Sequence, residues 1–188
     1  MSTFEVQKKK AAKPMLWVSM ASMSMVFAGL TSAFVVRKAE GNWLDFDYPT
    51  AFYVSTLLII LSSISIHWAK RKVRNNQITQ ANFFMVITFL LGVSFAISQY
   101  LGWGDLYQRG IFFTGPGSNA SGSFVYVITL LHLVHLAGGL ITLLFTGVKL
   151  SMNKYSAENM LGLELCAIFW HFLDFLWVYL FLFFLYIR

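Results

Sequence analysis

Five apolar stretches, each long enough to cross a bilayer, restrict the folds open to this chain. A hydrocarbon core about 30 Å thick requires roughly 20 apolar residues in a helix. Because backbone groups in lipid must hydrogen-bond within their own segment, continuous runs of this length form helices; the alternating pattern of a membrane β-barrel is missing. The sequence predicts an all-α integral membrane bundle of five transmembrane helices at about residues 15–36, 51–69, 83–101, 123–148 and 161–187.

Composition agrees with a membrane protein and excludes a soluble domain. Hydrophobic residues make up 57% of the chain and charged residues 12%, against about a quarter charged in soluble domains. Residues 1–14 form a basic tail, and residues 15–188 are expected to form a single transmembrane domain. The apolar run after the tail is too long for a signal peptide, so it is expected to remain in the mature protein. The single Cys166 offers no intrachain disulfide and no metal cluster.

The basic residues divide unequally between the two ends of the predicted helices. Ten lie on the side of the N-terminus and of the second and fourth connections, and four on the other side. Cytoplasmic loops collect Lys and Arg, which predicts a cytoplasmic N-terminus and a periplasmic C-terminus. This distribution explains the net charge of +6 without a nucleic-acid partner.

Few ionisable residues fall inside the predicted helices, where they are costly and should face the bundle interior. His67 is interpreted as a boundary residue that reaches the interface. His132 and His135 share one face of the fourth helix. Glu164, His171 and Asp174 share one broad stripe of the fifth helix. At about 1.5 Å per residue, the two groups reach a similar depth, so hydrogen bonds between them are geometrically possible.

Three interpretations compete for this cluster of residues: a metal or haem site, a proton or ion relay, and a structural polar network. Metal sites usually take three or four ligands, and the histidines here are few. Small residues such as Gly92 and Gly139 suit close helix packing, which favours a structural network. Phosphate-binding glycine loops, nucleophile elbows and HExxH motifs are missing. The chain is therefore interpreted as a membrane partner within something larger.

The last helix resembles a known family. Residues 163–177, LELCAIFWHFLDFLW, are similar to the signature of subunit III of haem–copper oxidases, a Glu followed by an aromatic-Trp-His-Phe-Val-Asp-x-x-Trp run. Three further segments resemble the family in the same order. They are Ser63–Ala69, Gly92–Phe95 with Gln99, and Gly122–Phe124 followed by His132–His135 and Gly139.

The resemblance implies a non-catalytic accessory subunit III of a proton-pumping cytochrome c oxidase in a bacterial inner membrane. It implies that haems and copper lie in partner subunits and none on this chain, with subunit I as the main contact and subunit II as another. It also implies stabilisation of subunit I and binding of phospholipid. The residues carried over as a buried structural network are His132, His135, Glu164, His171 and Asp174; those carried over as lipid-associated are Trp170, His171 and Trp177.

The sequence departs from the family in two respects. The longest members have seven helices and this chain has five, as in a short bacterial form. Met23 stands where the family usually has a buried Glu in its first shared helix, so no proton-uptake role is transferred to that position. The alternatives are subunit III of a quinol oxidase, a homologue associated with nitric oxide reductase and, from another class, a stand-alone proton-coupled transporter.

Overall fold

The structure, a computed structural model, describes residues 3–156 and 158–187, with side chains from residue 10 onward. It contains the five predicted helices, each long and apolar enough to cross a membrane. The all-α bundle is thereby confirmed within the described residues. The helices are α1 (Thr3–Ala39), α2 (Thr50–Arg74), α3 (Ile78–Gln108), α4 (Ala120–Ser151) and α5 (Leu161–Tyr186).

The first four helices extend beyond both ends of the apolar runs, because polar residues continue the helix outside the bilayer. α1 begins at Thr3, so most of the expected tail is helical; Met1 and Ser2 lie outside the described residues. α4 begins at Ala120, because the Asn119 side chain accepts a hydrogen bond from the Ser121 amide and caps the helix. The end of α3 carries a bidentate pair between Arg109 and Asp105, with a shortest distance of 2.7 Å.

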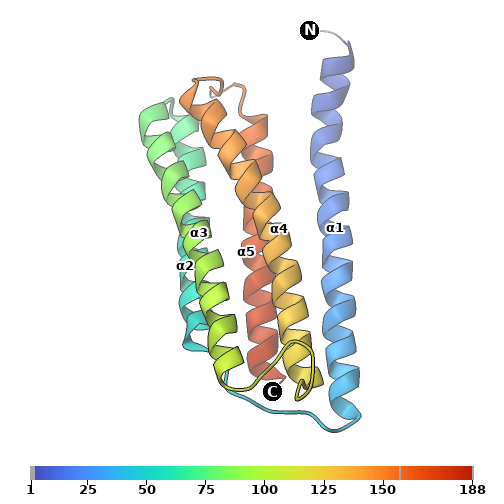
Figure 1. Cartoon of the computed structure of the whole chain (residues 1–188). Helices are drawn as coiled ribbons and strands as arrows, with labels where there is room; N and C mark the ends of the chain where they lie inside the picture. Colours follow the sequence, from blue (N-terminus) through green and yellow to red (C-terminus); the bar gives the residue numbers. More distant parts are fainter. Residues whose placement is uncertain (1–2, 157, 188) are drawn as a thin grey trace.

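The five helices run side by side, and the two chain ends lie at opposite ends of the bundle (Figure 1). α2 and α3 form a long hairpin through a tight turn in which Asn76 takes a positive φ of 56°. α3 packs on α4, and α5 packs on α2, α4 and α1. Among the described residues, α1 packs only on α4 and α5, so it stands at the side of the bundle.

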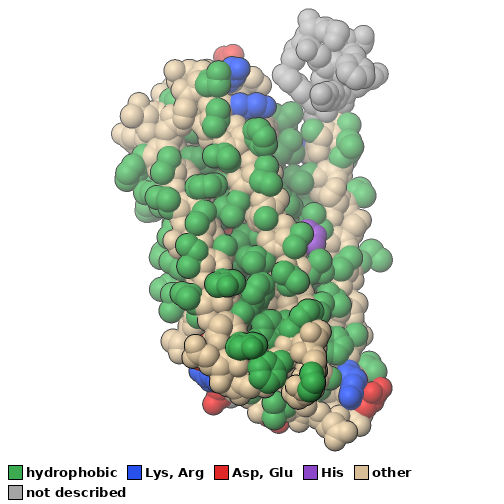
Figure 2. Space-filling view, in the orientation of Figure 1, with side chains coloured by type: hydrophobic (Ala, Val, Ile, Leu, Met, Phe, Trp, Pro, Cys, Tyr) green, Lys and Arg blue, Asp and Glu red, His purple; other side chains and the backbone are tan. Residues whose placement is uncertain are grey.

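Apolar side chains cover the middle of the molecule and charged side chains gather at its two ends (Figure 2). The buried core is aromatic, with Phe27 of α1, Phe52 of α2, Phe95 of α3 and both Trp170 and Trp177 of α5 fully enclosed. α5 therefore carries the largest buried side chains and lies at the centre of the bundle.

Candidate functional site

Two tryptophans fix α5 against α2. Trp170 and Trp177 are two helical turns apart and therefore project from one side of α5. The Trp170 Nε1 donates to Ser62 Oγ at 3.0 Å, and the Trp177 Nε1 donates to Thr56 Oγ1 at the same distance. Both indoles are 0% exposed, so protein encloses two of the three residues expected to contact lipid.

His132 is surrounded by aromatic rings. Its ring centroid lies 5.2 Å from that of Trp177 and 5.8 Å from that of Phe95, and Phe27 of α1 approaches from another side. The side chain is fully buried, and neither ring nitrogen hydrogen-bonds to a described residue. His132 therefore packs as one more aromatic ring at the contact of α1, α3, α4 and α5.

His135 and Glu164 both link α1 to the bundle. His135 Nδ1 lies 2.8 Å from the carbonyl oxygen of Leu131, within its own helix, and its ring packs against Phe27. Glu164 forms an ion pair of 2.7 Å with Lys13 near the start of α1. Because this pair is partly exposed, we expect it to contribute less than about 1 kcal/mol.

A smaller polar group lies between α2 and α5. Ser63 Oγ is 2.6 Å from His171 Nδ1, whereas neither oxygen of the Asp174 carboxyl group hydrogen-bonds to a described residue. Asp174 is 4% exposed and His171 is half-buried. Ser63 of α2 is therefore the hydrogen-bond partner of His171, and Asp174 is buried beside this pair on the same helix as His171.

The hydrogen bonds that a similar depth made possible between the two pairs do not form among the described residues. The histidines of α4 contact aromatic rings and a backbone carbonyl, whereas His171 hydrogen-bonds to Ser63 of α2 and Asp174 has no hydrogen-bond partner among the described residues. The two pairs share a depth, but α5 is rotated so that its polar side chains point toward a different helix. The structure thus separates the predicted network into an aromatic site, an ion pair with α1 and a polar seam with α2.

The cluster has no geometry for metal binding. Within the described residues, no group of three or more His, Cys, Asp or Glu side chains lies close enough to hold a metal ion.

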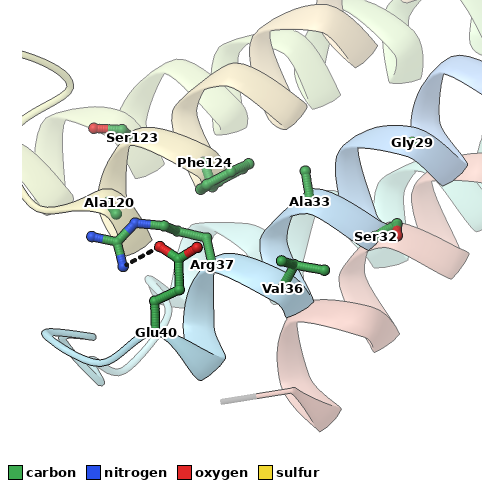
Figure 3. Close-up of a pocket in the computed structure, with 9 residues that line it drawn as sticks. All are labelled: Gly29, Ser32, Ala33, Val36, Arg37, Glu40, Ala120, Ser123 and Phe124. Atoms are coloured by element: carbon green, nitrogen blue, oxygen red, sulfur yellow. Dashed lines mark ion pairs between the residues drawn. The ribbon is translucent and has the colours of Figure 1, made fainter.

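A hollow with a volume of about 640 Å³ separates α1 from α4 near the end of α1 (Figure 3). Gly29 has no side chain and those of Ala33 and Ala120 are single methyl groups, so these residues leave the gap between the helices open. Arg37 and Glu40 line it and pair with each other at 3.5 Å.

The hydroxyls on α2 form hydrogen bonds to neighbouring helices that the sequence reasoning missed. Ser55 and Ser62, and likewise Thr56 and Ser63, are two helical turns apart, so each pair occupies one side of α2. Hydroxyls repeated at this spacing in an apolar run indicate a polar contact with a neighbouring helix. The pattern could have predicted the seam, although not its partner helix.

Comparison with known proteins decides the family. A family model described as cytochrome c oxidase subunit III matches residues 46–188, which include all of α2 to α5. The chain belongs to this family. The resemblance seen in the last helix is therefore confirmed, and the family match covers the α2–α5 seam and the aromatic site except for Phe27 of α1.

Individual subunit III relatives extend the similarity into α1. A Mycobacterium tuberculosis protein named "Probable cytochrome c oxidase subunit 3" is 31% identical over 178 residues, covering 92% of this chain and 85% of the relative. A cytochrome c oxidase subunit 3 from Thermostichus vulcanus is 29% identical, covering 88% of this chain and 82% of the relative. Subunit 3 of a cytochrome bo(3) ubiquinol oxidase from Buchnera aphidicola is 26% identical, covering 89% of each chain. The chain is accordingly a multi-pass membrane protein and an accessory subunit III of a haem–copper oxidase.

Proposed function

We propose that this chain is the non-catalytic third subunit of a cytochrome c oxidase in a bacterial inner membrane. Subunit I would hold the haems and copper, subunit II would receive electrons, and this chain would stabilise subunit I. The main support for the proposal is the similarity to the mycobacterial subunit over 92% of the chain. The buried side chains of α5 support a structural role, because they hydrogen-bond to α2 and pack against neighbouring helices.

The proposed role includes binding of phospholipid. Because Trp170 and Trp177 are enclosed by protein, the lipid would contact other, exposed apolar side chains of the bundle. Extraction of lipid from the purified complex and mass spectrometry would test this part. A complex that is fully active after complete removal of phospholipid would contradict it.

An affinity tag on this chain would test the whole proposal. The purified material should show haem absorption and should oxidise reduced cytochrome c with O2 as acceptor. An Asp174→Ala variant should lower the yield of complex but leave the haem spectrum of the assembled fraction unchanged. Loss of haem absorption with assembly intact would contradict a non-catalytic role.

A quinol oxidase is the second candidate, because the Buchnera relative carries that name. The same purified complex distinguishes the two. Activity with a ubiquinol and none with reduced cytochrome c would assign this chain to a quinol oxidase.

A further inference from the structure

The outward face shared by α2 and α5 carries polar side chains among apolar ones. Ser63 and His171 meet on it and are both half-buried. Ile60 and His67 lie one turn to either side of Ser63, and Phe175 lies one turn after His171; all three are exposed. We call these five residues the α2–α5 face.

The polar part of this face lies deep in the membrane. His171 is ten residues after the start of α5, which places it about 15 Å along the helix. The hydrocarbon core is about 30 Å thick, so His171 lies near its middle. A lipid headgroup therefore cannot reach His171 from the surface, and only acyl chains or another protein segment can cover it.

One nitrogen of His171 lacks a hydrogen-bond partner within the described chain. Nδ1 is bonded to Ser63, whereas Nε2 bonds to none of the described residues and is not enclosed by them. A polar group that faces hydrocarbon without a hydrogen bond is costly, and ionisable residues in membranes usually face protein. An acyl chain offers no donor or acceptor, so a protein side chain fits this position better.

A basic rim borders the same face toward the end of α2. Lys70 and Arg74 follow His67 at helical spacing and, together with it, line a concavity of about 340 Å³. Both cations also lie close enough to Glu164 to act on its charge. Because Glu164 is already paired with Lys13, the rim keeps a positive charge that complements an acidic side chain.

We propose that the α2–α5 face binds a transmembrane helix of a partner oxidase subunit. That helix would place a hydroxyl or amide side chain against His171 Nε2 and an acidic residue against Lys70 and Arg74. This inference rests on the proposed function, since it requires an oxidase complex. Phospholipid is the competing occupant. Its phosphate could pair with Lys70 and Arg74, but its acyl chains offer no hydrogen-bond partner to the His171 imidazole.

Photo-crosslinking in the intact complex tests the proposal. A benzophenone amino acid replaces Phe175 on the α2–α5 face or, as a matched control, Phe145 on α4, which is similarly exposed at 66% against 73%. We expect position 175 to give an adduct with another oxidase subunit, and position 145 to give mainly lipid adducts. Lipid adducts alone at position 175, or equal protein adducts at both positions, would overturn the proposal.

Retention of the subunit during detergent washing provides a second measurement. His171→Leu should increase the loss of this chain from the haem-containing complex about threefold, the effect of one hydrogen bond of average strength in a membrane. His171→Asn should restore part of the retention, and Phe145→Leu should leave it unchanged. Equal retention of the wild type and His171→Leu would contradict the inference. If the wild-type chain does not co-purify with haem at all, the proposed function itself fails.

Discussion

Trp170 is the residue at which four helices meet. Its Nε1 donates to Ser62 of α2, and its ring lies against Gly92 of α3 and Gly139 of α4. A Cβ at Gly92 would lie 2.7 Å from the Trp170 ring, and one at Gly139 would lie 3.2 Å from it. Glycine at these positions lets the α3 and α4 backbones approach the indole, as small residues do in membrane helix contacts.

Gly92→Ala should therefore destabilise the protein. The new methyl group would meet the Trp170 ring and the Leu140 side chain, and overpacking of this kind costs about 1–3 kcal/mol. Gly138→Ala is the matched control, because nothing lies within 4 Å of its Cβ position. Unfolding in detergent by increasing SDS would measure the stability of both variants. An equal loss of stability in the two would contradict this account of packing.

The bond from Trp170 to Ser62 should show coupling in a double-mutant cycle. Trp170→Phe and Ser62→Ala each remove one partner, and the double variant removes both. Interhelical hydrogen bonds in membranes contribute about 0.6 kcal/mol on average, so we expect a coupling energy of about 0.5–1.5 kcal/mol for this buried pair. The same SDS unfolding assay gives the change in unfolding free energy for the two single variants and for the double variant. Strict additivity would show that the indole acts through packing alone.

Among the five elements, α1 is the one with the weakest attachment. It packs only on α4 and α5 among the described residues, and it lies outside the residues matched by the family model. Phe27 inserts between the rings of His132 and His135, Phe34 packs against Phe124 and Phe183, and Lys13 pairs with Glu164. Because α1 buries only Met20, Phe27, Thr31 and Phe34 among its described side chains, it should detach before the other helices.

Phe27→Ala should loosen α1 selectively. Removal of a fully buried aromatic ring costs about 3 kcal/mol in well-packed sites. Amide hydrogen exchange in detergent should show faster exchange in α1, with α2 and α3 little changed. Met25→Ala, at a side chain that is 76% exposed, should leave the exchange of α1 unaltered. Equal exchange in the wild type and Phe27→Ala would contradict this attachment.

At the scale of the whole molecule, the bundle has two distinct ends. The start of α1, the α2–α3 turn and the α4–α5 connection share one end, and the C-terminus lies at the other (Figure 1). The basic residues at the end of α2, Lys149 in the last turn of α4 and Lys154 after it lie at the first end, together with Lys10 and Lys13. This arrangement agrees with an odd number of spans, and the cytoplasmic position of that end remains a prediction from charge.

Thiol labelling would test the orientation. A membrane-impermeant maleimide should label Ser118→Cys, in the connection between α3 and α4, from outside intact cells. It should label Asn159→Cys, in the connection between α4 and α5, only after the membrane is opened. The native Cys166 is 2% exposed and should remain unlabelled. The reverse labelling pattern would show that the N-terminus lies outside.

The five spans and the family both follow from the residues alone. Length and hydropathy predict a membrane helix because lipid forces each backbone segment to satisfy its own hydrogen bonds. The last helix resembled subunit III because its Trp, His and Asp stand at specific spacings. The depth of His132 and Asp174 was also accessible, since rise per residue is constant in a helix.

The rotational orientation of each helix about its axis could not be predicted from the sequence and was decided by the tertiary structure. Rise per residue sets how deep a side chain lies but not which neighbour it faces, and that depends on how large and small side chains interlock. Here Trp170 fits against Gly92 and Gly139, which directs His171 toward Ser63 of α2 and leaves His132 among aromatic rings. The polar cluster inferred as one network is for this reason three separate contacts.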